Sequence, residues 1–375
     1  MTETSPPAPA PTPGARLTCP SCGAEVTDAE RFCEACGAPL SPTTEAVAPG
    51  GAGAESPVEL SGRVGATAVG AAPAPPAPAA GPPCTSCGGV VDADGYCTTC
   101  GTKAPSPRDH YVEQPATWVA AVCDRGIRHH KNEDATAVAA DPEPGSRAVL
   151  VVCDGVSTST DSDVAALAGA RTARDVLVAA RASGLGVAAS RAAALAQSLG
   201  VASAQANEAV IANTAPESDN AASCTFAAAV LEGDLVVFGT VGDSRVYWLP
   251  DAGAGDPLQL SVDDSMAQVR IEMGVDRVEA ENGPQAHAIT KWLGRDSTDV
   301  VPRTGSIALG VPGWLMVCSD GLWNYCSSAA DLQALVATTQ AETGADPLPL
   351  ARALVVWANA QGGRDNISVA LARHA

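Results

Sequence analysis

Arg147-Ala-Val-Leu-Val-Val-Cys-Asp154-Gly155 is a run of apolar residues that ends abruptly in a carboxylate. Such a run predicts a buried central strand that delivers its aspartate to the rim of a sheet, where the glycine lets the backbone turn. The stretch Trp314-Leu-Met-Val-Cys-Ser319-Asp320-Gly321 repeats this pattern much later in the chain. The sequence therefore predicts two central strands that each end in an acidic side chain.

Two further acidic positions flank predicted strands. Asn132-Glu133-Asp134 comes just before Ala135-Thr-Ala-Val-Ala-Ala, and Asp365-Asn366 comes just before Ile-Ser-Val-Ala-Leu. Carboxylate oxygens are the ligands that hard divalent cations prefer. Four acidic positions at the ends of strands therefore predict a site for hard metal ions.

The composition limits the classes of partner. The 375 residues carry 22 Lys and Arg against 42 Asp and Glu, a formal net charge of −20. Phosphate contacts need a surplus of basic residues, so this balance argues against unspecific binding to nucleic acid or to anionic membranes. No apolar stretch reaches the roughly 18 residues of a membrane span, and no signal peptide is recognisable. We expect a cytoplasmic protein, whose 13 cysteines should not form a disulfide scaffold.

Changes in composition divide the chain into parts. Residues 1–16 and 41–82 are dominated by Pro, Ala, Gly and Thr. We expect the first of these segments to be disordered and the second to be a flexible linker, because neither can build a core. Two cysteine-rich units occupy residues 17–40 and 83–104, and a folded domain is expected at 112–375.

Each cysteine-rich unit contains two Cys-x-x-Cys pairs followed by glycine, and the second unit repeats the first. The two-residue spacer presents both sulfurs to one tetrahedral ion, so the pattern predicts two structural zinc ribbons. The expected zinc ligands are Cys19, Cys22, Cys33 and Cys36 in the first ribbon and Cys84, Cys87, Cys97 and Cys100 in the second. Redox-active thiols are the alternative, but the βαβ pattern around such motifs is missing.

The ribbons carry few basic residues, and only Phe32 and Tyr96 are available to stack on a base. Nucleic-acid binding is therefore the weaker interpretation of these units. We expect them to dock onto a protein partner.

The domain from residue 112 is predicted to contain short strands and long helices. Strands are expected near 118–123, 135–140, 147–153, 223–231, 234–240, 244–249, 314–319 and 366–372. Helices are expected at about 161–182, 187–212, 264–273, 329–340 and 346–360. This arrangement favours layered sheets with helices packed outside them.

Five short motifs follow one another in this domain. They are Gly126-Ile-Arg-His-His-Lys-Asn-Glu-Asp134, Asp154-Gly155, Gly242-Asp-Ser-Arg245, Ser319-Asp-Gly-Leu-Trp323 and Gly363-Arg-Asp-Asn366. Their order and spacing resemble the metal-dependent protein serine/threonine phosphatases of type 2C, the PPM family in its bacterial form. The resemblance implies an α+β fold, an antiparallel β-sandwich flanked by helices, with two Mn²⁺ or Mg²⁺ ions at one edge and sometimes a third.

The resemblance also implies roles for individual residues. Asp154 would bridge both metals, Glu133 and the carbonyl of Gly155 would complete one metal, and Asp320 and Asp365 would hold the other. Asp134, Asp243 and Asn366 would surround these ligands without binding the two metals directly. The alternative for each acidic residue is a solvated aspartate in a turn, which is common at Asp-Gly steps.

The sequence departs from the family pattern on the substrate side of the site. Val156-Ser157-Thr158 stands where the family usually continues with further glycines, and His129 stands where many members have an arginine that grips the substrate phosphate. Arg128 is adjacent and is expected to reach the same phosphate. The animal enzymes of the family have a histidine directly after Asp-Gly that is thought to protonate the leaving group. Val156 stands at that position here and cannot do so, which leaves His287 and His130 as weak candidates for that role. Residues 274–286 lie where the family carries a mobile flap.

Three functions compete on these observations. The first is an active phosphatase of phosphoserine and phosphothreonine proteins, the products of a serine/threonine kinase, with the ribbons as docking modules. The second is a pseudophosphatase that serves as an adaptor, which the departures favour slightly. A ribbon-based nucleic-acid binder is opposed by the charge. We prefer the enzyme, because all the predicted metal-ligand carboxylates are present.

Overall fold

The computed structural model describes residues 16–18, 25–27, 83–181 and 186–375. The first four cysteines of the ribbon pattern and the linker predicted at 41–82 lie outside the described residues, as does the segment predicted to be disordered except for Arg16. Contacts divide the chain into two units, Met1–Pro105 and Ser106–Ala375.

The N-terminal unit contains two short pieces of regular structure. Strand β1 (Arg16–Thr18) pairs antiparallel with β2 (Glu25–Thr27), so Arg16 belongs to a strand and not to a disordered segment. Around the second set of cysteines, single antiparallel bridges join Val91 to Cys97 and Tyr96 to Lys103. These bridges bring the two Cys-x-x-Cys turns of this ribbon together.

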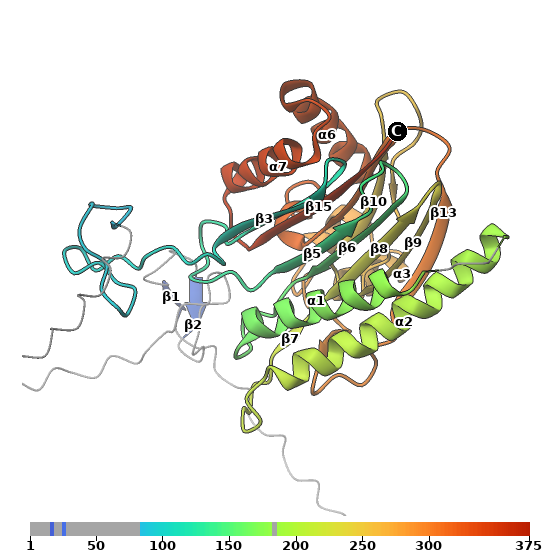
Figure 1. The fold of residues 1–375 in the computed structure, drawn as a ribbon. Coiled ribbons are helices and arrows are strands. Elements are labelled where there is room, and N and C mark those ends of the chain that lie inside the picture. Colours follow the sequence, from blue (N-terminus) through green and yellow to red (C-terminus); the bar gives the residue numbers. More distant parts are fainter. Residues whose placement is uncertain (1–15, 19–24, 28–82, 182–185) are drawn as a thin grey trace, which may run out of the picture. The chain divides into compact units, whose positions relative to one another are not determined.

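The larger unit is built from two antiparallel sheets (Figure 1). The six-stranded sheet has the order β11 (Leu258–Gln259), β10 (Arg245–Pro250), β14 (Gly313–Cys318), β15 (Ile367–His374), β4 (Val119–Asp124) and β3 (His110–Ala116). The five-stranded sheet has the order β13 (Arg303–Ala308), β9 (Leu235–Val241), β8 (Phe226–Glu232), β6 (Arg147–Cys153) and β5 (Ala135–Ala140). A small pair is formed by β7 (Ser223–Cys224) and β12 (Leu293–Gly294).

The continuous apolar run of β6 is explained by burial of both of its faces. Leu150 and Val152 join the core between the two sheets together with Val317 of β14. The alternate residues Val149 and Val151 join a second core on the outer face of the same sheet. A strand that is covered on both faces needs apolar residues at every position, so it does not show the alternation of a half-exposed strand.

Helices cover the outer faces of the sandwich (Figure 1). The helices α1 (Ser162–Ala179) and α2 (Ala188–Ala212) pack on the five-stranded sheet, while α6 (Ala329–Thr343) and α7 (Pro347–Gln361) pack on the six-stranded sheet. Shorter helices are α3 (Met266–Glu272), α4 (Arg277–Glu281) and α5 (Asp320–Trp323). The predicted α+β sandwich flanked by helices is confirmed.

All eight predicted strands and all five predicted helices are present within a few residues of their expected bounds. The prediction missed β3 and β13, which lie at the edges of the two sheets, and the short elements β11, β12, α4 and α5. The strand predicted at 223–231 is divided into β7 and β8, which belong to different sheets. Edge strands are half-exposed and tolerate proline and bulges, and β3 contains both Pro115 and a register shift between Glu113 and Ala116. Such strands lack the apolar run that identifies a central strand.

Arg147 is the one charged residue of the β6 run, and it is buried. Its guanidinium lies 3.1 Å from Glu232 and donates to the carbonyls of Leu177 and Ala180 at 2.7 and 2.9 Å. Both carbonyls belong to the C-terminal end of α1, whose last carbonyls have no partner within the helix. Arg147 therefore caps α1 and ties it to the five-stranded sheet.

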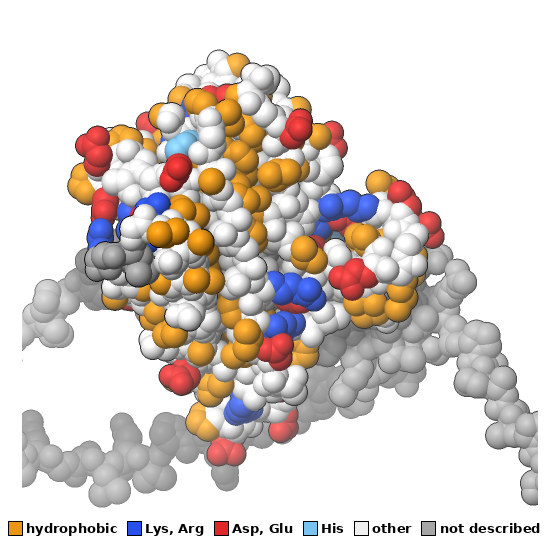
Figure 2. Space-filling view, turned by 90° about the vertical axis from the view of Figure 1, so that its right-hand side faces the viewer, with side chains coloured by type: hydrophobic (Ala, Val, Ile, Leu, Met, Phe, Trp, Pro, Cys, Tyr) orange, Lys and Arg blue, Asp and Glu red, His pale blue; other side chains and the backbone are white. Residues whose placement is uncertain are grey.

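On the face shown in Figure 2, Lys and Arg side chains lie close to Asp and Glu side chains, and hydrophobic side chains are scattered among polar ones. The described part of this face shows no broad basic surface. In the described chain, no helix is long and apolar enough to cross a membrane.

Candidate active site and metal centre

The predicted acidic residues gather at one edge of the sandwich because the strands that carry them end there. Asp154 follows β6, Asp320 is the first residue of α5 directly after β14, and Asp365 precedes β15. Asp134 precedes β5, and Asp243 lies in the turn between β9 and β10. We refer to these five residues as the acid cluster.

Four members of the acid cluster, Asp134, Asp154, Asp243 and Asp320, have raised pKa values. Burial raises the pKa of Asp154 well above its ordinary value, and the charges of the other four members raise it further. Asp320 is raised in the same way, first by burial and then by Asp365, Asp243 and Asp134. Burial is also the main cause that lifts the pKa of Asp134 to about 6 and that of Asp243 to about 7. A divalent cation would relieve this unfavourable concentration of acids.

Unpartnered oxygens in the cluster fit the same interpretation. The Oδ1 atoms of Asp134 and Asp320 are buried and have no hydrogen-bond partner among the described residues. Buried polar atoms normally have a partner, so such orphans indicate a missing ion or water. Carboxylate oxygens select hard ions such as Mg²⁺ and Mn²⁺. The residues present therefore fit the predicted metals.

The carboxylates do not converge on one point. In the part of the chain that the structure describes, only the four ribbon thiols have ligand atoms that all lie within 4.8 Å of one another. The carboxylates of the acid cluster are therefore spread more widely than the thiols of the ribbon.

Glu133 is held by positively charged and polar neighbours. Its side chain is 3 % exposed, lies 3.2 Å from the Lys131 ammonium and accepts a hydrogen bond from the hydroxyl of Ser162. The imidazole of His129 lies 3.9 Å from Glu133 and 3.3 Å from Asp365. Glu133 therefore already has partners for its negative charge, and a bound metal would compete with them.

The structure places the other candidates for substrate contact, Arg128, His130 and His287, in different surroundings. Arg128 is exposed, and among the described residues its guanidinium has no carboxylate partner. His130 is exposed as well. The ring of His287, by contrast, lies 5.9 Å from that of Trp323. Partial burial lowers the pKa of His287, and the charge of Asp365 opposes this shift.

Asn366 fixes the loop that carries Glu133. Its side-chain oxygen accepts the backbone N–H of Glu133 at 2.8 Å. Its amide nitrogen donates to the carbonyls of Arg125 and Lys131 at 2.7 and 3.2 Å. Because Asn366 adjoins Asp365, one residue sets the distance between two of the predicted ligands. Asn366 therefore links the loop of Glu133 to the start of β15.

Three supporting residues, Thr225, Ser244 and Ser319, were missed by the sequence analysis. The backbone N–H of Asp154 donates to the Thr225 hydroxyl at 2.9 Å, and this hydroxyl lies 2.7 Å from that of Ser244. The Ser319 hydroxyl donates to Asp134 at 2.7 Å. The sequence offered a signal for Ser244 and Ser319, since both belong to the quoted motifs. Their partners, however, lie 19 and 185 residues away along the chain.

Glycines allow the loops of the cluster to approach one another. A Cβ atom on Gly155 would lie 2.6 Å from the carbonyl oxygen of Glu133, and one on Gly126 would lie 2.0 Å from that of Asp365. Gly126 also has a positive φ of 73°. Both positions therefore need glycine for contact between the loops that hold the predicted ligands.

We expect Gly126→Ala to reduce metal-dependent activity by at least about tenfold, because the new methyl group would push the Asp365 loop away from the cluster. Gly253→Ala is the matched control, since Gly253 has a similar φ of 82° and open space around its Cβ position. Phosphate release and thermal unfolding of both full-length variants would be measured. Equal activity in the two variants would contradict the importance of this close approach.

The second ribbon brings its four thiols together. The Sγ atoms of Cys84 and Cys100 lie 3.7 Å apart, and those of Cys87 and Cys97 lie 3.4 Å apart. The backbone N–H groups of Ser86, Gly89 and Thr99 point at these sulfurs at 3.4 Å. Four thiols with N–H donors around them fit a tetrahedral zinc site.

Substitution of Cys97 by alanine is expected to lower the zinc content of the full-length chain by about half, because each ribbon should bind its ion independently. Cys326→Ala is a control outside the ribbons, since Cys326 is buried in the core beneath α6 and α7. Elemental analysis of the purified proteins gives the answer. Unchanged zinc in the Cys97 variant would show that the second ribbon does not hold the metal.

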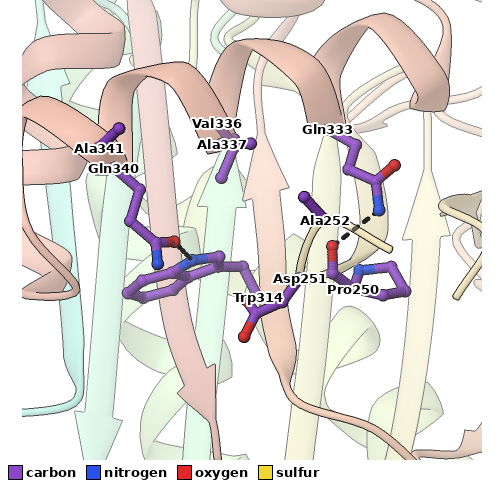
Figure 3. A pocket seen from close by; sticks show the side chains of 9 residues that line it. All are labelled: Pro250, Asp251, Ala252, Trp314, Gln333, Val336, Ala337, Gln340 and Ala341. Atoms are coloured by element: carbon purple, nitrogen blue, oxygen red, sulfur yellow. Dashed lines mark hydrogen bonds between the residues drawn. The ribbon is translucent and has the colours of Figure 1, made fainter. Parts of the chain in front are cut away.

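A pocket of about 330 Å³ between α6 and the edge of the six-stranded sheet lies away from the acid cluster (Figure 3). Trp314 lines it and donates to Gln340 at 2.7 Å, while Gln333 donates to the carbonyl of Pro250 at 2.7 Å. Trp314 is near the start of β14, whereas Asp320 follows its end. The pocket is therefore not part of the candidate active site.

Known proteins resemble both the cysteine-rich region and the larger unit of this chain. The double zinc ribbon family model matches residues 19–101. The serine/threonine phosphatase stp of Listeria innocua is 28 % identical over 252 residues, covering 66 % of this chain and 92 % of that protein.

Solved structures agree with this similarity. The serine/threonine phosphatase of S. agalactiae has a TM-score of 0.54 at 25 % identity, over 70 % of this chain and 98 % of that one. The PPM Ser-Thr phosphatase MsPP from Mycobacterium smegmatis has a TM-score of 0.50 at 27 % identity, over 68 % and 97 %. The resemblance to type 2C phosphatases and the presence of a double ribbon are confirmed.

Proposed function

We propose that this chain, which has the fold of the bacterial type 2C phosphatases and is similar to them in sequence, removes phosphate from phosphoserine and phosphothreonine proteins with the help of divalent metal ions. The observation that carries the proposal is the acid cluster, in which burial and neighbouring charges raise the pKa values of Asp154 and Asp320 and two buried oxygens lack partners. Such a cluster needs cations, and two divalent cations are suited to phosphate chemistry.

The predicted ligands divide into two sets. Glu133 and the carbonyl of Gly155 would hold one ion, Asp320 and Asp365 would hold the other, and Asp154 would be shared. When bound, the ions would neutralise the phosphate and lower the pKa of a water molecule between them. The proposed ligands follow the family motifs and rest on the shared edge of the sandwich.

The residues of the chain itself would orient and bind the reactants. Asn366 would keep the Glu133 and Asp365 loops in register through its three hydrogen bonds. Arg128, which is exposed in the loop between β4 and β5, would bind a phosphate oxygen of the substrate. His129 lies between Glu133 and Asp365 and would limit the space into which the phosphate enters.

The ribbons would recruit a protein partner, either a phosphorylated substrate or the serine/threonine kinase that produces it. Val90 and Tyr96 of the second ribbon are exposed by 62 % and 47 %. Exposed apolar and aromatic side chains on a small metal-stabilised unit suit protein recognition better than nucleic-acid binding. This agrees with the formal net charge of −20.

The test is phosphate release from a phosphothreonine peptide by the full-length chain, with Mn²⁺, with Mg²⁺ and with a chelator of divalent cations. We expect release with metal and none with the chelator, and restoration when metal is added back. No release from a folded, metal-supplied protein would refute the enzyme and support the pseudophosphatase. Circular dichroism would establish that the protein is folded.

A further inference from the structure

Residues 266–289 form a small layer next to the acid cluster with little core of its own. Its buried apolar residues are three alanines, Ala267, Ala280 and Ala286, with Ile271 and Val275 partly buried against them. Three alanine side chains bury too little apolar surface to hold such a segment in place. Polar contacts with the sandwich must therefore fix its position.

Both ends of this segment are attached at the same place. Ser265 and Ile289 form an antiparallel bridge, and the N–H of Thr290 donates to the carbonyl of Asp264 at 2.8 Å. The N–H of Asp264 in turn donates to the carbonyl of Gly242 at 2.8 Å, next to Asp243 of the acid cluster. The segment is thus a loop that leaves and rejoins the sandwich at one place beside the candidate site.

One ionic contact reaches from the middle of the segment to the sandwich. Glu281, at the end of α4, is 11 % exposed and accepts from the Arg245 guanidinium at 2.8 Å. Its second oxygen accepts from the Ser327 hydroxyl at 2.7 Å. Although burial alone would raise its pKa, the Ser327 hydrogen bond and the charge of Arg245 hold the pKa of Glu281 below its ordinary value. Glu281 is therefore ionised at neutral pH.

Arg245 does not need Glu281 to balance its charge. It also pairs with the buried Asp263 at 2.7 Å. Its guanidinium lies 3.6 Å above the ring of Trp323, whose indole N–H donates to the carbonyl of Asp243 at 3.0 Å. Arg245 would thus keep a carboxylate partner and its packing if Glu281 were neutral, so the pair with Glu281 acts on the segment and not on the core.

A polar cleft adjoins the base of the segment, where its two ends meet. It has a volume of about 380 Å³, begins at Thr290 and continues past Lys291, Trp292, Ser297 and Arg303. Hydroxyl groups, charged side chains and an aromatic ring suit the backbone and polar side chains of a peptide better than an apolar ligand. Asp264 and Thr290, which flank the base of the segment, both line this cleft, so the segment adjoins a cleft of the kind that a phosphorylated peptide would use.

We propose that Glu281 is a positioning residue that latches residues 266–289 onto Arg245 and thereby sets how tightly a phosphorylated peptide binds. The kinetic part of this proposal rests on the proposed phosphatase function. The latch itself does not, because it is a property of the fold.

The first experiment measures the latch directly in the full-length chain. Arg270 lies within the segment and is a cleavage site for trypsin. Arg277 also lies there but pairs with Glu281 itself at 3.1 Å, so only cleavage after Arg270 reports on the segment. Glu281→Gln keeps the size of the side chain and removes its charge, and Glu281→Ala removes all its contacts. We expect tryptic cleavage after Arg270 to become about tenfold faster in both variants, because local opening becomes easier.

Glu279→Gln is the matched control for this experiment, since Glu279 lies on the same helix, is exposed and has the same charge. It should be cleaved at the rate of the unsubstituted protein. Cleavage of both Glu281 variants at that same rate would overturn the latch. Thermal unfolding of each variant would separate a local change from a general loss of stability.

The second experiment compares two substrates. With a phosphothreonine peptide, Glu281→Gln should raise KM by about tenfold and leave kcat within about twofold, since the acid cluster is untouched. With p-nitrophenyl phosphate, which makes no peptide contacts, both constants should stay unchanged. Parallel losses on both substrates would contradict the positioning role. If the unsubstituted chain releases no phosphate, the proposed function fails. The rates of tryptic cleavage would still show whether Glu281 holds the segment on Arg245.

Discussion

Substitution of Asp154 by asparagine is expected to lower metal-dependent phosphate release by on the order of a thousandfold or more, to the detection limit. Asp154 is the member of the acid cluster whose pKa responds to all four other members. It is therefore central to the cluster, as expected for the ligand proposed to be shared by both metals. An amide has the same shape but carries no negative charge and offers only one oxygen.

The same substitution is expected to stabilise the protein in the presence of a chelator. Burial and neighbouring charges raise the pKa of Asp154, which means that the folded protein disfavours the ionised form. At neutral pH a neutral asparagine avoids this penalty, so thermal unfolding of the metal-free variant should occur several degrees higher.

The control for Asp154→Asn is Asp256→Asn, which changes an exposed aspartate in the turn before β11. It should alter neither activity nor stability. Full activity in Asp154→Asn would refute the assignment of the site. Lower stability of this variant without metal would show that Asp154 supports the fold and is not held there for metal binding.

The sequence predicted the central strands because burial on both faces leaves a continuous apolar run. Strand β6 shows this most clearly, and its bounds agree with the prediction. Strand β13 was missed because its sequence, Arg-Thr-Gly-Ser-Ile-Ala, has only one large apolar residue. An edge strand receives its backbone hydrogen bonds from one neighbour and packs little, so its sequence is weakly constrained.

The sequence also predicted which acidic residues gather, since each lies at the end of a recognisable strand or in a motif. It did not predict that Lys131 and Ser162 would hold Glu133, or that Glu281 would pair with Arg245. Lys131 is only two residues from Glu133, but the direction of its side chain depends on the conformation of the loop. Ser162 and Glu281 belong to other elements, α1 and α4. Contacts of this kind depend on how elements pack, which a pattern of residue types does not determine.

Without metal, the stability of the full-length protein is expected to fall as pH rises from about 4 to about 7. An aspartate has an ordinary pKa of 3.8, whereas in the folded protein the pKa of Asp134 is about 6 and that of Asp243 about 7. Between these values the folded state binds more protons than the unfolded state. Stability must therefore decrease with rising pH, since its slope follows the difference in bound protons.

Bound Mn²⁺ or Mg²⁺ should weaken this pH dependence, because a cation favours the ionised carboxylates and lowers their pKa values in the folded state. Thermal unfolding between pH 4.5 and 7.5, with chelator and with saturating metal, would measure both effects. Without metal, the unfolding temperature should drop by several degrees across this range. A metal-free protein whose stability rises with pH would show that the carboxylates are already paired with positive charges, and the acid cluster would then not need metal ions.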